Sequence, residues 1–324
     1  MSKRYRPIVG VSKCLEFDNC RYDGKLLNNS FVNKLKEFVD FIPVCPEMGI
    51  GLGSPRKPIR LVRIGKEKNL YQPSTDTNLT QKMRDFTEEF TSSISKIDGF
   101  ILKRGSPTCG INNVRMYHNT QKDVAYDKSS GLFAEMVIKK FPLIIREDEG
   151  RLNNLTIREN FLTRLFAMCK LRKIIENNSL NELEEFHKNN HVLFIQHSLK
   201  LTMELDLILK NKTKVNFDEL SSTYKRITYN ILCRVPSKDG VKQSIDEIYY
   251  FTKEKISDSE AQHFTQIVKE YDNGIIQPSH IFTLLYSWVL RFGIVELQDQ
   301  TIFNPFPKDL IKDLLSKPKE YAIA

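Results

Sequence analysis

The feature that most limits the fold of this chain is a repeated order of apolar segment, loop and amphipathic segment over its first 150 residues. The apolar runs have strand length and cover residues 6–13, 41–44, 99–102 and 142–145. Between them, apolar residues recur at helical spacing over 29–39, 77–97 and 131–140. Such alternation is typical of parallel strands covered by helices on both faces. We therefore predict an α/β fold with a Rossmann-like parallel sheet for this part.

The second apolar run leads into a loop that carries two reactive side chains. Cys45 and Glu47 follow the run at once, and glycines, prolines and cations follow them up to Arg60. Loops at strand ends are where α/β proteins place their chemistry, because a rigid strand fixes side chains that the loop leaves accessible. Cys45 and Glu47 are therefore the first site candidates.

Three cysteines share this position after a strand. Cys14, Cys45 and Cys109 each follow a separate apolar run, and the loops after parallel strands emerge at one edge of the sheet. Their spacing matches no local iron–sulfur or zinc motif. The three thiols either converge on a metal or are small buried residues near strand ends, as unpaired cysteines often are. The pattern leaves both interpretations open.

Convergence would constrain the chemistry. Three soft thiolates suit an iron–sulfur cluster or zinc, and a missing fourth ligand leaves an open metal position that favours soft donors such as sulfur. Glu47 could then supply or remove protons beside Cys45. Ser106, close to Cys109, could donate a hydrogen bond to a developing oxyanion or orient a water molecule.

The pattern changes to helices beyond residue 150. Helical spacing dominates the segments 155–176, 180–211, 217–234, 242–256, 258–273 and 278–291. We therefore predict an α/β catalytic domain at 1–150, a helical linker at 151–178 and an all-α domain at 179–324.

Composition indicates the compartment and the class of partner. Six cysteines in 324 residues are too sparse for a disulfide scaffold, and no apolar run approaches the length of a membrane span. We expect a cytoplasmic protein without a membrane partner, and we favour a monomer. The net charge of +9 divides into about +7 for residues 1–150 and about +2 for the rest, which favours a polyanionic partner such as nucleic acid.

Ordered sequence blocks within residues 5–150 resemble the signature of the thiouracil desulfidase family. The blocks are Val11–Leu15, Cys20–Gly24, Pro43–Glu47, Gly51–Arg56 and Leu102–Gly110. The resemblance implies a [4Fe-4S] cluster held by Cys14, Cys45 and Cys109. Its fourth iron would bind the sulfur of a thiolated pyrimidine. Water would replace that sulfur without redox change, and hydrosulfide would leave.

The same resemblance assigns roles to neighbouring residues. It implies that Glu47 is the acid and base, and that Ser106 orients the substrate. Asp23 is a weaker candidate for the same pocket, and its alternative role is that of a turn-forming aspartate before Gly24. Cys20 lies inside a matched block, but we interpret it as a nearby free thiol.

The helical half resembles, more loosely, a domain of unknown function that is fused to tRNA 4-thiouridine desulfidases. The similar segments are Phe186–Lys188, Gln196–Ser198, Tyr224–Pro236 and Tyr249–Phe251. The resemblance implies that this domain binds tRNA. We therefore predict a tRNA 4-thiouridine desulfidase, with a free thiopyrimidine base as the alternative substrate. The alternatives to a desulfidase are electron transfer and a non-catalytic iron–sulfur RNA-binding protein, which would need Cys20 as a fourth ligand.

Two basic segments and three histidines have more than one interpretation. Residues 51–68 hold six cations and one acid, and form either a phosphate-binding rim or a solvated loop. Residues 210–242 have a net charge of +5 and include Tyr224 and Tyr229, which fits phosphate contact with base stacking or a solvated helix face. His187, His191 and His197 could suggest a second metal site, but we interpret them as core or surface histidines, because only the first two share a helical face.

Overall fold

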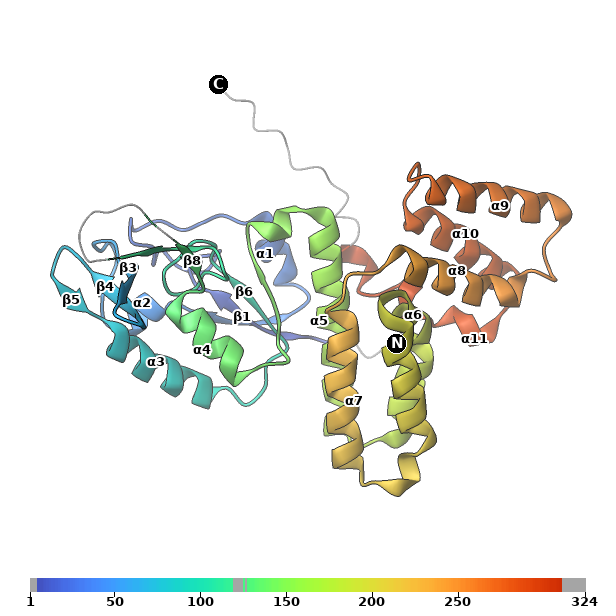
Figure 1. Ribbon diagram of the computed structural model, residues 1–324, viewed down its shortest axis with the longest axis horizontal. Helices are drawn as coiled ribbons and strands as arrows, with labels where there is room; N and C mark the ends of the chain where they lie inside the picture. Colours follow the sequence, from blue (N-terminus) through green and yellow to red (C-terminus); the bar gives the residue numbers. More distant parts are fainter. Residues whose placement is uncertain (1–4, 119–124, 126, 311–324) are drawn as a thin grey trace. The chain divides into compact units, whose positions relative to one another are not determined.

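The computed structural model describes residues 5–118, 125 and 127–310, and the chain divides into two compact units (Figure 1). The first unit contains the residues up to Cys169, and the second runs from Lys170 to Lys308. The division falls inside the segment 151–178. The first unit is α/β and the second is entirely helical, so the predicted fold class is confirmed.

A parallel sheet forms the centre of the first unit. Its strands stand in the order β2-β1-β6-β9, and all three neighbouring pairs are parallel. The strands are β1 (Ile8–Ser12), β2 (Asp40–Val44), β6 (Gly99–Leu102) and β9 (Ile145–Asp148). Because all four run in one direction, the loops that carry Cys14, Cys45 and Cys109 leave the sheet at the same edge.

Close packing fixes how β1 and β6 lie against each other. Gly10 pairs with Phe100 across the two strands, and the Phe100 ring occupies the space where a side chain at position 10 would lie. A Cβ on Gly10 would stand only 2.2 Å from that ring. Glycine is therefore required here by the close approach of an aromatic ring.

Helices cover both faces of this sheet, as predicted. On one face, α3 (Thr80–Ser93) and α4 (Leu132–Lys140) pack together, and the rings of Phe100 and Phe133 meet edge to face. On the other face, Leu165 of α5 (Leu155–Glu176) lies directly over Gly99. The guanidinium of Arg158 on α5 covers the ring of Phe31 on α1 (Ser30–Leu35) at 4.8 Å. These contacts enclose the strands in apolar side chains.

A second sheet, which the sequence did not predict, extends the core of this unit. Its order is β5-β4-β3-β7-β8. The strands are β3 (Arg60–Ile64), β4 (Glu67–Gln72), β5 (Thr77–Asn78), β7 (Val114–Tyr117) and β8 (Asp127–Ser129). Leu61, Leu70 and Met116 join the cluster that contains Phe100 and Phe133. Over its second half, the basic segment 51–68 is therefore not a loop, because β3 and β4 form an antiparallel hairpin there.

The second unit is built from helices at or near the predicted ranges. They are α6 (Leu180–Lys210), α7 (Phe217–Leu232), α8 (Lys238–Thr252), α9 (Asp258–Asp272) and α10 (Pro278–Arg291). The short helix α11 (Val295–Gln298) was not predicted. The described residues also form single turns of 3-10 helix, η1 (Arg151–Asn153) in the first unit and η2 (Lys212–Lys214) and η3 (Thr301–Phe303) in the second. Trp288 of α10 and Phe264 of α9 lie in one buried cluster with Ile245 of α8, which ties these three helices together.

Helix α6 reverses direction at Ser198, although its sequence reads as continuous helix. Ser198 has an extended backbone (φ −171°, ψ 100°), and its Oγ accepts a hydrogen bond from the backbone N–H of Leu201 at 3.4 Å. This is the geometry of a helix N-cap. We call residues 180–197 the first arm of α6 and residues 199–210 the second arm. Asp206 on the second arm contacts His187 on the first, so the arms lie against each other.

Among the described residues, no helix is both long enough and apolar enough to cross a membrane.

Candidate active site

The three cysteines singled out by their place in the sequence line one cavity. Cys14 follows β1, Cys45 follows β2 and begins the short helix α2 (Pro46–Gly49), and Cys109 lies in the loop after β6. The cavity has a volume of about 330 Å³ and opens at the carboxyl edge of the parallel sheet. The topology thus brings together thiols that are far apart in the sequence.

A fourth thiol, Cys20, lines the same cavity. Its side chain is 1% exposed, and it interacts with the thiols of both Cys14 and Cys45. The contact with Cys14 is the main reason that the pKa of Cys20 is raised to about 11. Sequence reasoning placed Cys20 nearby as a free thiol, and the structure places it in direct contact with two of the candidate ligands.

Two further thiols of the cavity, Cys45 and Cys109, also have raised pKa values. The pKa of Cys45 is raised by its contact with Cys20, by burial and by the charge of Glu47. Burial, followed by the charge of Glu47, raises the pKa of Cys109. A positively charged metal centre would reverse this preference, because it stabilises the thiolate that binds to it. A cation bound in the cavity would therefore favour ionisation of Cys20, Cys45 and Cys109.

Glu47 lies at the centre of the polar contacts in the cavity. The side chain is 8% exposed, and its Oε1 accepts a hydrogen bond from Thr108 Oγ1 at 2.7 Å and a longer one from Ser106 Oγ at 3.4 Å. Its other oxygen, Oε2, lies 3.4 Å from Cys45 Sγ. A buried carboxylate held between two hydroxyls and a thiol is placed to exchange protons with a ligand in the cavity.

Ser106 is oriented by the backbone of its own loop. Its Oγ accepts hydrogen bonds from the backbone N–H groups of Thr108 at 3.3 Å and Cys109 at 3.1 Å. The same oxygen lies 3.0 Å from Thr108 Oγ1. The two hydroxyls thus form a chain that ends on Glu47. Thr108 was not predicted, and its only sequence signal is its position directly before Cys109.

Arg56 is a second residue that the sequence did not place in the site. It lies within the basic segment 51–68, yet its guanidinium is buried, 3.7 Å from Glu47 Oε2. Its Nη1 donates hydrogen bonds to the carbonyl oxygens of Cys20 at 2.8 Å and Gly53 at 2.9 Å. Arg56 therefore offsets the charge of Glu47 and fixes the loop that carries Cys20.

Two families match the chain, one in each unit. Residues 9–149 match the family described as "2-thiouracil desulfurase", and residues 191–307 match the family described as "Protein of unknown function (DUF1722)". Residues 9–149 form a 2-thiouracil desulfurase domain. We call residues 9–149 the desulfurase domain and residues 191–307 the DUF1722 domain.

Relatives of the desulfurase domain include one curated protein and one solved structure. The "Uncharacterized protein YbbK" of Bacillus subtilis (strain 168) is 29% identical over 112 residues, which are 32% of this chain and 73% of that protein. A structure titled "[4Fe-4S]-dependent thiouracil desulfidase TudS" is 22% identical, with a TM-score of 0.37, over 45% of this chain and 93% of that one.

Asp23 lies beside the cavity of the desulfurase domain and is not among the residues that line it. Its carboxylate pairs with Arg21 at 3.1 Å and accepts a hydrogen bond from the backbone N–H of Lys25 at 3.2 Å. These are the contacts of a residue that shapes a turn. Arg21 itself lines the cavity, so Asp23 reaches the site of the desulfurase domain through its ion-pair partner.

Cations outnumber acids on the wall of this cavity. The basic lining residues are Lys13, Arg21, Arg56, Lys103 and Arg104, and the acidic one is Glu47. Several of these cations are held by acids, such as Lys13 by Asp18 at 2.7 Å and Lys103 by Glu149. The cavity of the desulfurase domain is therefore suited to a ligand that brings negative charge.

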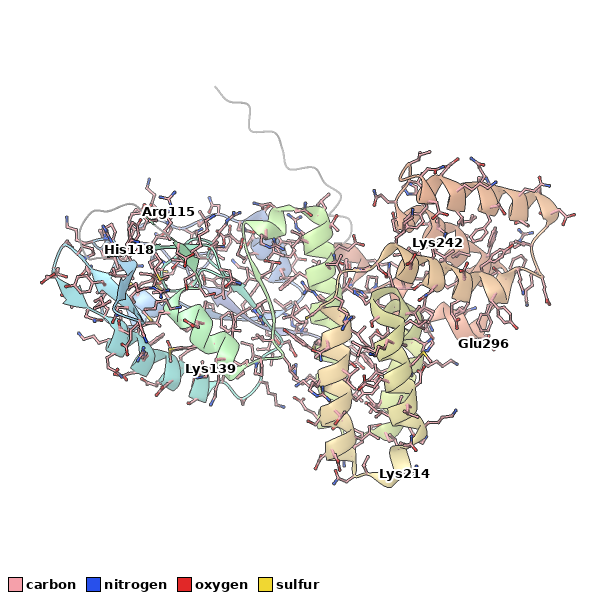
Figure 2. The ribbon with its side chains drawn as sticks, viewed as in Figure 1. Arg115, His118, Lys139, Lys214, Lys242 and Glu296 are labelled. Carbon is pink, nitrogen blue, oxygen red and sulfur yellow. The ribbon has the colours of Figure 1, made fainter. Side chains whose placement is uncertain are left out.

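The basic segment 210–242 overlaps the DUF1722 domain and differs from its predicted role. Tyr224 is fully buried and cannot stack on a base, so the prediction was wrong for this residue, while Tyr229 is partly exposed and its role stays a prediction. Lys238 and Lys242 share Asp272, at 3.7 and 3.0 Å, and Lys212 pairs with Glu184. Figure 2 shows Lys214 at the tip beyond α6 and Lys242 on α8, away from that tip. These cations therefore do not form a single patch.

Proposed function

We propose that this protein is a [4Fe-4S]-dependent desulfidase that converts 4-thiouridine in tRNA to uridine and releases hydrosulfide. The observation that carries the proposal is the cavity itself, where Cys14, Cys45 and Cys109 meet the carboxylate of Glu47 inside a 2-thiouracil desulfurase domain. The reaction exchanges a thiocarbonyl sulfur for the oxygen of water, so it needs a centre that binds sulfur and a group that moves protons.

The donor set fits an iron–sulfur cluster. Three of the cavity's cysteines come from three different loops and offer soft thiolate ligands, while the described residues of the cavity include no histidine. Cys14, Cys45 and Cys109 would hold the cluster, and Cys20 would remain beside it. A cluster with one iron free of protein ligands supplies a Lewis acid for the sulfur of the substrate.

Glu47 is placed to manage the protons of the exchange. Water that attacks the ring carbon must lose both protons, while the departing sulfur leaves as hydrosulfide and takes up one. The two carboxylate oxygens of Glu47 face different partners, with Thr108 and Ser106 on one side and Cys45 on the other. The carboxylate can therefore receive a proton on the hydroxyl side and return it towards the sulfur ligands.

Ser106 and Arg56 support this role in different ways. The Ser106 hydroxyl, fixed by two backbone N–H groups, is free to turn its proton towards an oxyanion on the ring. Arg56 holds Glu47 in place from the opposite side and adds positive charge at the cavity wall. A ring that gains negative charge during attack is stabilised by both.

Charge supports tRNA as the substrate. The chain has a net charge of +9, and five cations line the cavity where a nucleotide base would enter. The attached DUF1722 domain offers a second surface for a large ligand. A free thiouracil base is the second candidate, because a cavity of about 330 Å³ lies in the range that holds a single small molecule.

One experiment separates these substrates. The purified chain is reconstituted with iron and sulfide without oxygen, and then incubated with thiolated tRNA or with free thiouracil. We expect loss of the thiocarbonyl absorbance from tRNA together with release of hydrosulfide, and slower loss from the free base. Turnover of the free base alone would overturn the tRNA assignment. A cluster that forms but turns over neither substrate would favour the non-catalytic alternative.

A further inference from the structure

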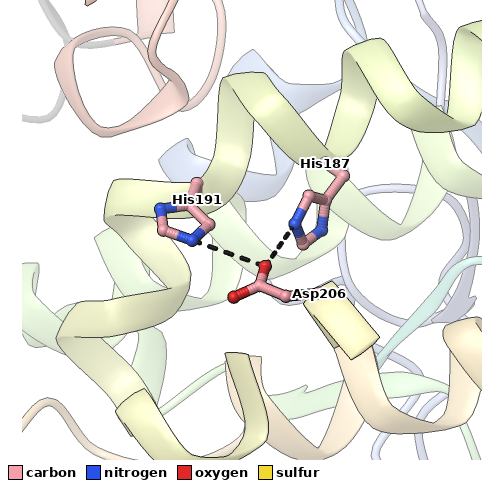
Figure 3. A group of neighbouring side chains, drawn as sticks. All are labelled: His187, His191 and Asp206. Carbon is pink, nitrogen blue, oxygen red and sulfur yellow. Dashed lines mark hydrogen bonds and ion pairs between the residues drawn. The ribbon is translucent and has the colours of Figure 1, made fainter. Parts of the chain in front are cut away.

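The reversal of α6 brings together three metal-binding side chains in the helical unit, far from the cysteine loops in sequence. His187 and His191 stand one turn apart on the first arm, and Asp206 projects from the second arm (Figure 3). Asp206 Oδ1 lies 2.8 Å from His187 Nε2 and 3.5 Å from His191 Nε2. The ligand atoms of these three side chains all lie within 4.8 Å of one another. Among the described residues, no other set of three histidine, cysteine or acidic side chains is grouped as closely.

The ring of His187 is held from behind by a buried tyrosine. Its Nδ1 lies 3.0 Å from the hydroxyl of Tyr224, which is fully buried. Histidines that bind metals through one nitrogen usually hydrogen-bond through the other, and this second contact fixes the ring and its tautomer. The Tyr224 hydroxyl supplies this contact and leaves Nε2 facing His191 and Asp206.

Solvent can reach the open side of this group. The side chain of His187 is 12% exposed, that of His191 is 31% exposed and that of Asp206 is 43% exposed. An ion could therefore enter without unfolding the helices, and water could complete its coordination. Metals bind histidine in its neutral form.

The distances also suit a metal ion. Bonds of about 2.0 to 2.2 Å in tetrahedral geometry place ligand atoms about 3.4 Å apart. The separation of 3.5 Å between His191 and Asp206 already meets this, and the 2.8 Å between His187 and Asp206 needs a small withdrawal of an exposed carboxylate. The proton on His187 Nε2 would pass to Nδ1, where it donates to Tyr224, and the imidazole stays neutral.

We propose that His187, His191 and Asp206 bind a divalent transition metal ion, with Zn²⁺ as the best fit, and that this ion joins the two arms of α6. Two imidazoles and one carboxylate form a ligand set that suits zinc, with water in the fourth position. Without an ion, Asp206 makes a hydrogen bond with His187 and a 3.5 Å contact with His191 across the hairpin. The function proposed for the cysteine cavity does not enter this inference.

The decisive variant is His191→Gln in the full-length chain. It removes one ligand and leaves the hydrogen bond between His187 and Asp206, which still joins the two arms of α6. The chain is stripped with a chelator, and Zn²⁺ is titrated by calorimetry. Because thiols also bind zinc, Co²⁺ is titrated in parallel, since thiolate ligands give intense near-ultraviolet bands and histidine ligands do not.

We expect the wild-type chain to bind one more equivalent of Zn²⁺ than His191→Gln does. If the stoichiometry is the same, the wild-type chain should bind this equivalent over about tenfold more tightly. The cobalt bands of the thiolates should be unchanged by the variant. His197→Gln is the matched control, because His197 lies on the same arm and its Nδ1 contacts the carbonyl oxygen of Arg234 at 2.6 Å. It should bind zinc as the wild-type chain does. Equal stoichiometry and affinity in wild type, His191→Gln and Asp206→Asn would overturn the proposal.

Discussion

The carboxylate of Glu47 and the hydroxyl of Thr108 lie 2.7 Å apart in a cavity whose other walls carry thiols and cations. Thr108 is fully buried, and Glu47 is nearly so. The Thr108 hydroxyl therefore fixes the orientation of the Glu47 carboxylate, because water cannot readily replace a buried hydrogen-bond partner. Thr108 is a positioning residue for the proposed proton transfer.

Replacement of Thr108 by valine tests this relationship. Valine keeps the shape of threonine and removes the hydroxyl, which leaves one oxygen of Glu47 with only the longer contact to Ser106. We expect kcat for thiolated tRNA to fall about tenfold, or about 1.4 kcal/mol in activation free energy, with little change in KM. Thr108→Ser should restore most of the rate. An unchanged kcat in Thr108→Val would show that the hydroxyl does not act through Glu47.

Serine substitutions at Cys14, Cys45 and Cys109 test the proposed cluster ligands. Each variant should fail to gain the visible absorbance of a [4Fe-4S] cluster on reconstitution and should lose desulfidase activity, because a serine hydroxyl is a hard and poor ligand for iron in such clusters. Cys233→Ser is the control, since Cys233 is exposed. Cys20→Ala should retain both cluster and activity. Loss of the cluster in Cys20→Ala would instead indicate four protein ligands.

The raised pKa of Cys20 predicts slow alkylation in the metal-free chain. Contact with Cys14 raises the pKa of Cys20 to about 11, so very little thiolate is present at neutral pH. Because the thiolate is the nucleophile, iodoacetamide at about pH 8 should label Cys233 well before Cys20. The rate at Cys20 should rise as the pH approaches its pKa. Mass spectrometry of peptides measures both, and equal early labelling of the two cysteines would contradict the prediction.

The pKa of His187 predicts how the stability of the helical unit depends on pH. Burial lowers this pKa below its ordinary value of 6.5, against the opposing effect of Asp206. The unfolded chain then binds more protons than the folded one below about pH 6.5, so stability is lost as the pH falls through that value. With chelator present, Tm of the wild-type chain should drop between about pH 7.5 and 5.5 more steeply than Tm of His187→Gln. Parallel profiles would show that His187 does not contribute.

The contact between Gly10 and Phe100 predicts a large effect from one methyl group. Gly10→Ala would place a Cβ 2.2 Å from the Phe100 ring, so the ring or the strands must move. We expect a loss of about 1 to 3 kcal/mol in the free energy of unfolding, measured by denaturant titration. The double variant Gly10→Ala with Phe100→Leu should be less destabilised than the sum of its parts. Additive losses would mean that the two residues do not compete for the same space.

The order of strands and helices was predictable because each element has a local signal. Apolar runs of strand length and helical spacing stand in the sequence itself, and parallel topology then places Cys14, Cys45 and Cys109 at one edge. The second sheet was missed because the hairpin of β3 and β4 is short and rich in charge. Its buried apolar positions are Leu61, Val62, Leu70 and Tyr71, and the polar residues Asn69 and Gln72 are buried beside them.

Other differences between the predicted and the observed structure arise from tertiary contacts or from sequence signals that the predictions did not use. Nothing next to Ser198 breaks the helical spacing, so the reversal of α6 and the approach of Asp206 to His187 depend on packing. By contrast, the burial of Tyr224 had a sequence signal. Leu220, Ile227 and Ile231 lie on the same face of α7 and are buried with it. Thr108 and Arg56 lie inside blocks that resemble the family, but their contacts with Glu47 depend on the fold.

The cysteine loops follow three strands that the chain must first align side by side, and this sets an order of events in the life of the protein. No short segment of the chain contains Cys14, Cys45 and Cys109 together, so the proposed cluster would need the aligned strands before it could bind all of its ligands. Maturation would then be a late step, performed on an already assembled sheet through the mouth of the cavity. Without iron, the chain would then keep its folded sheet and lack only the proposed cluster.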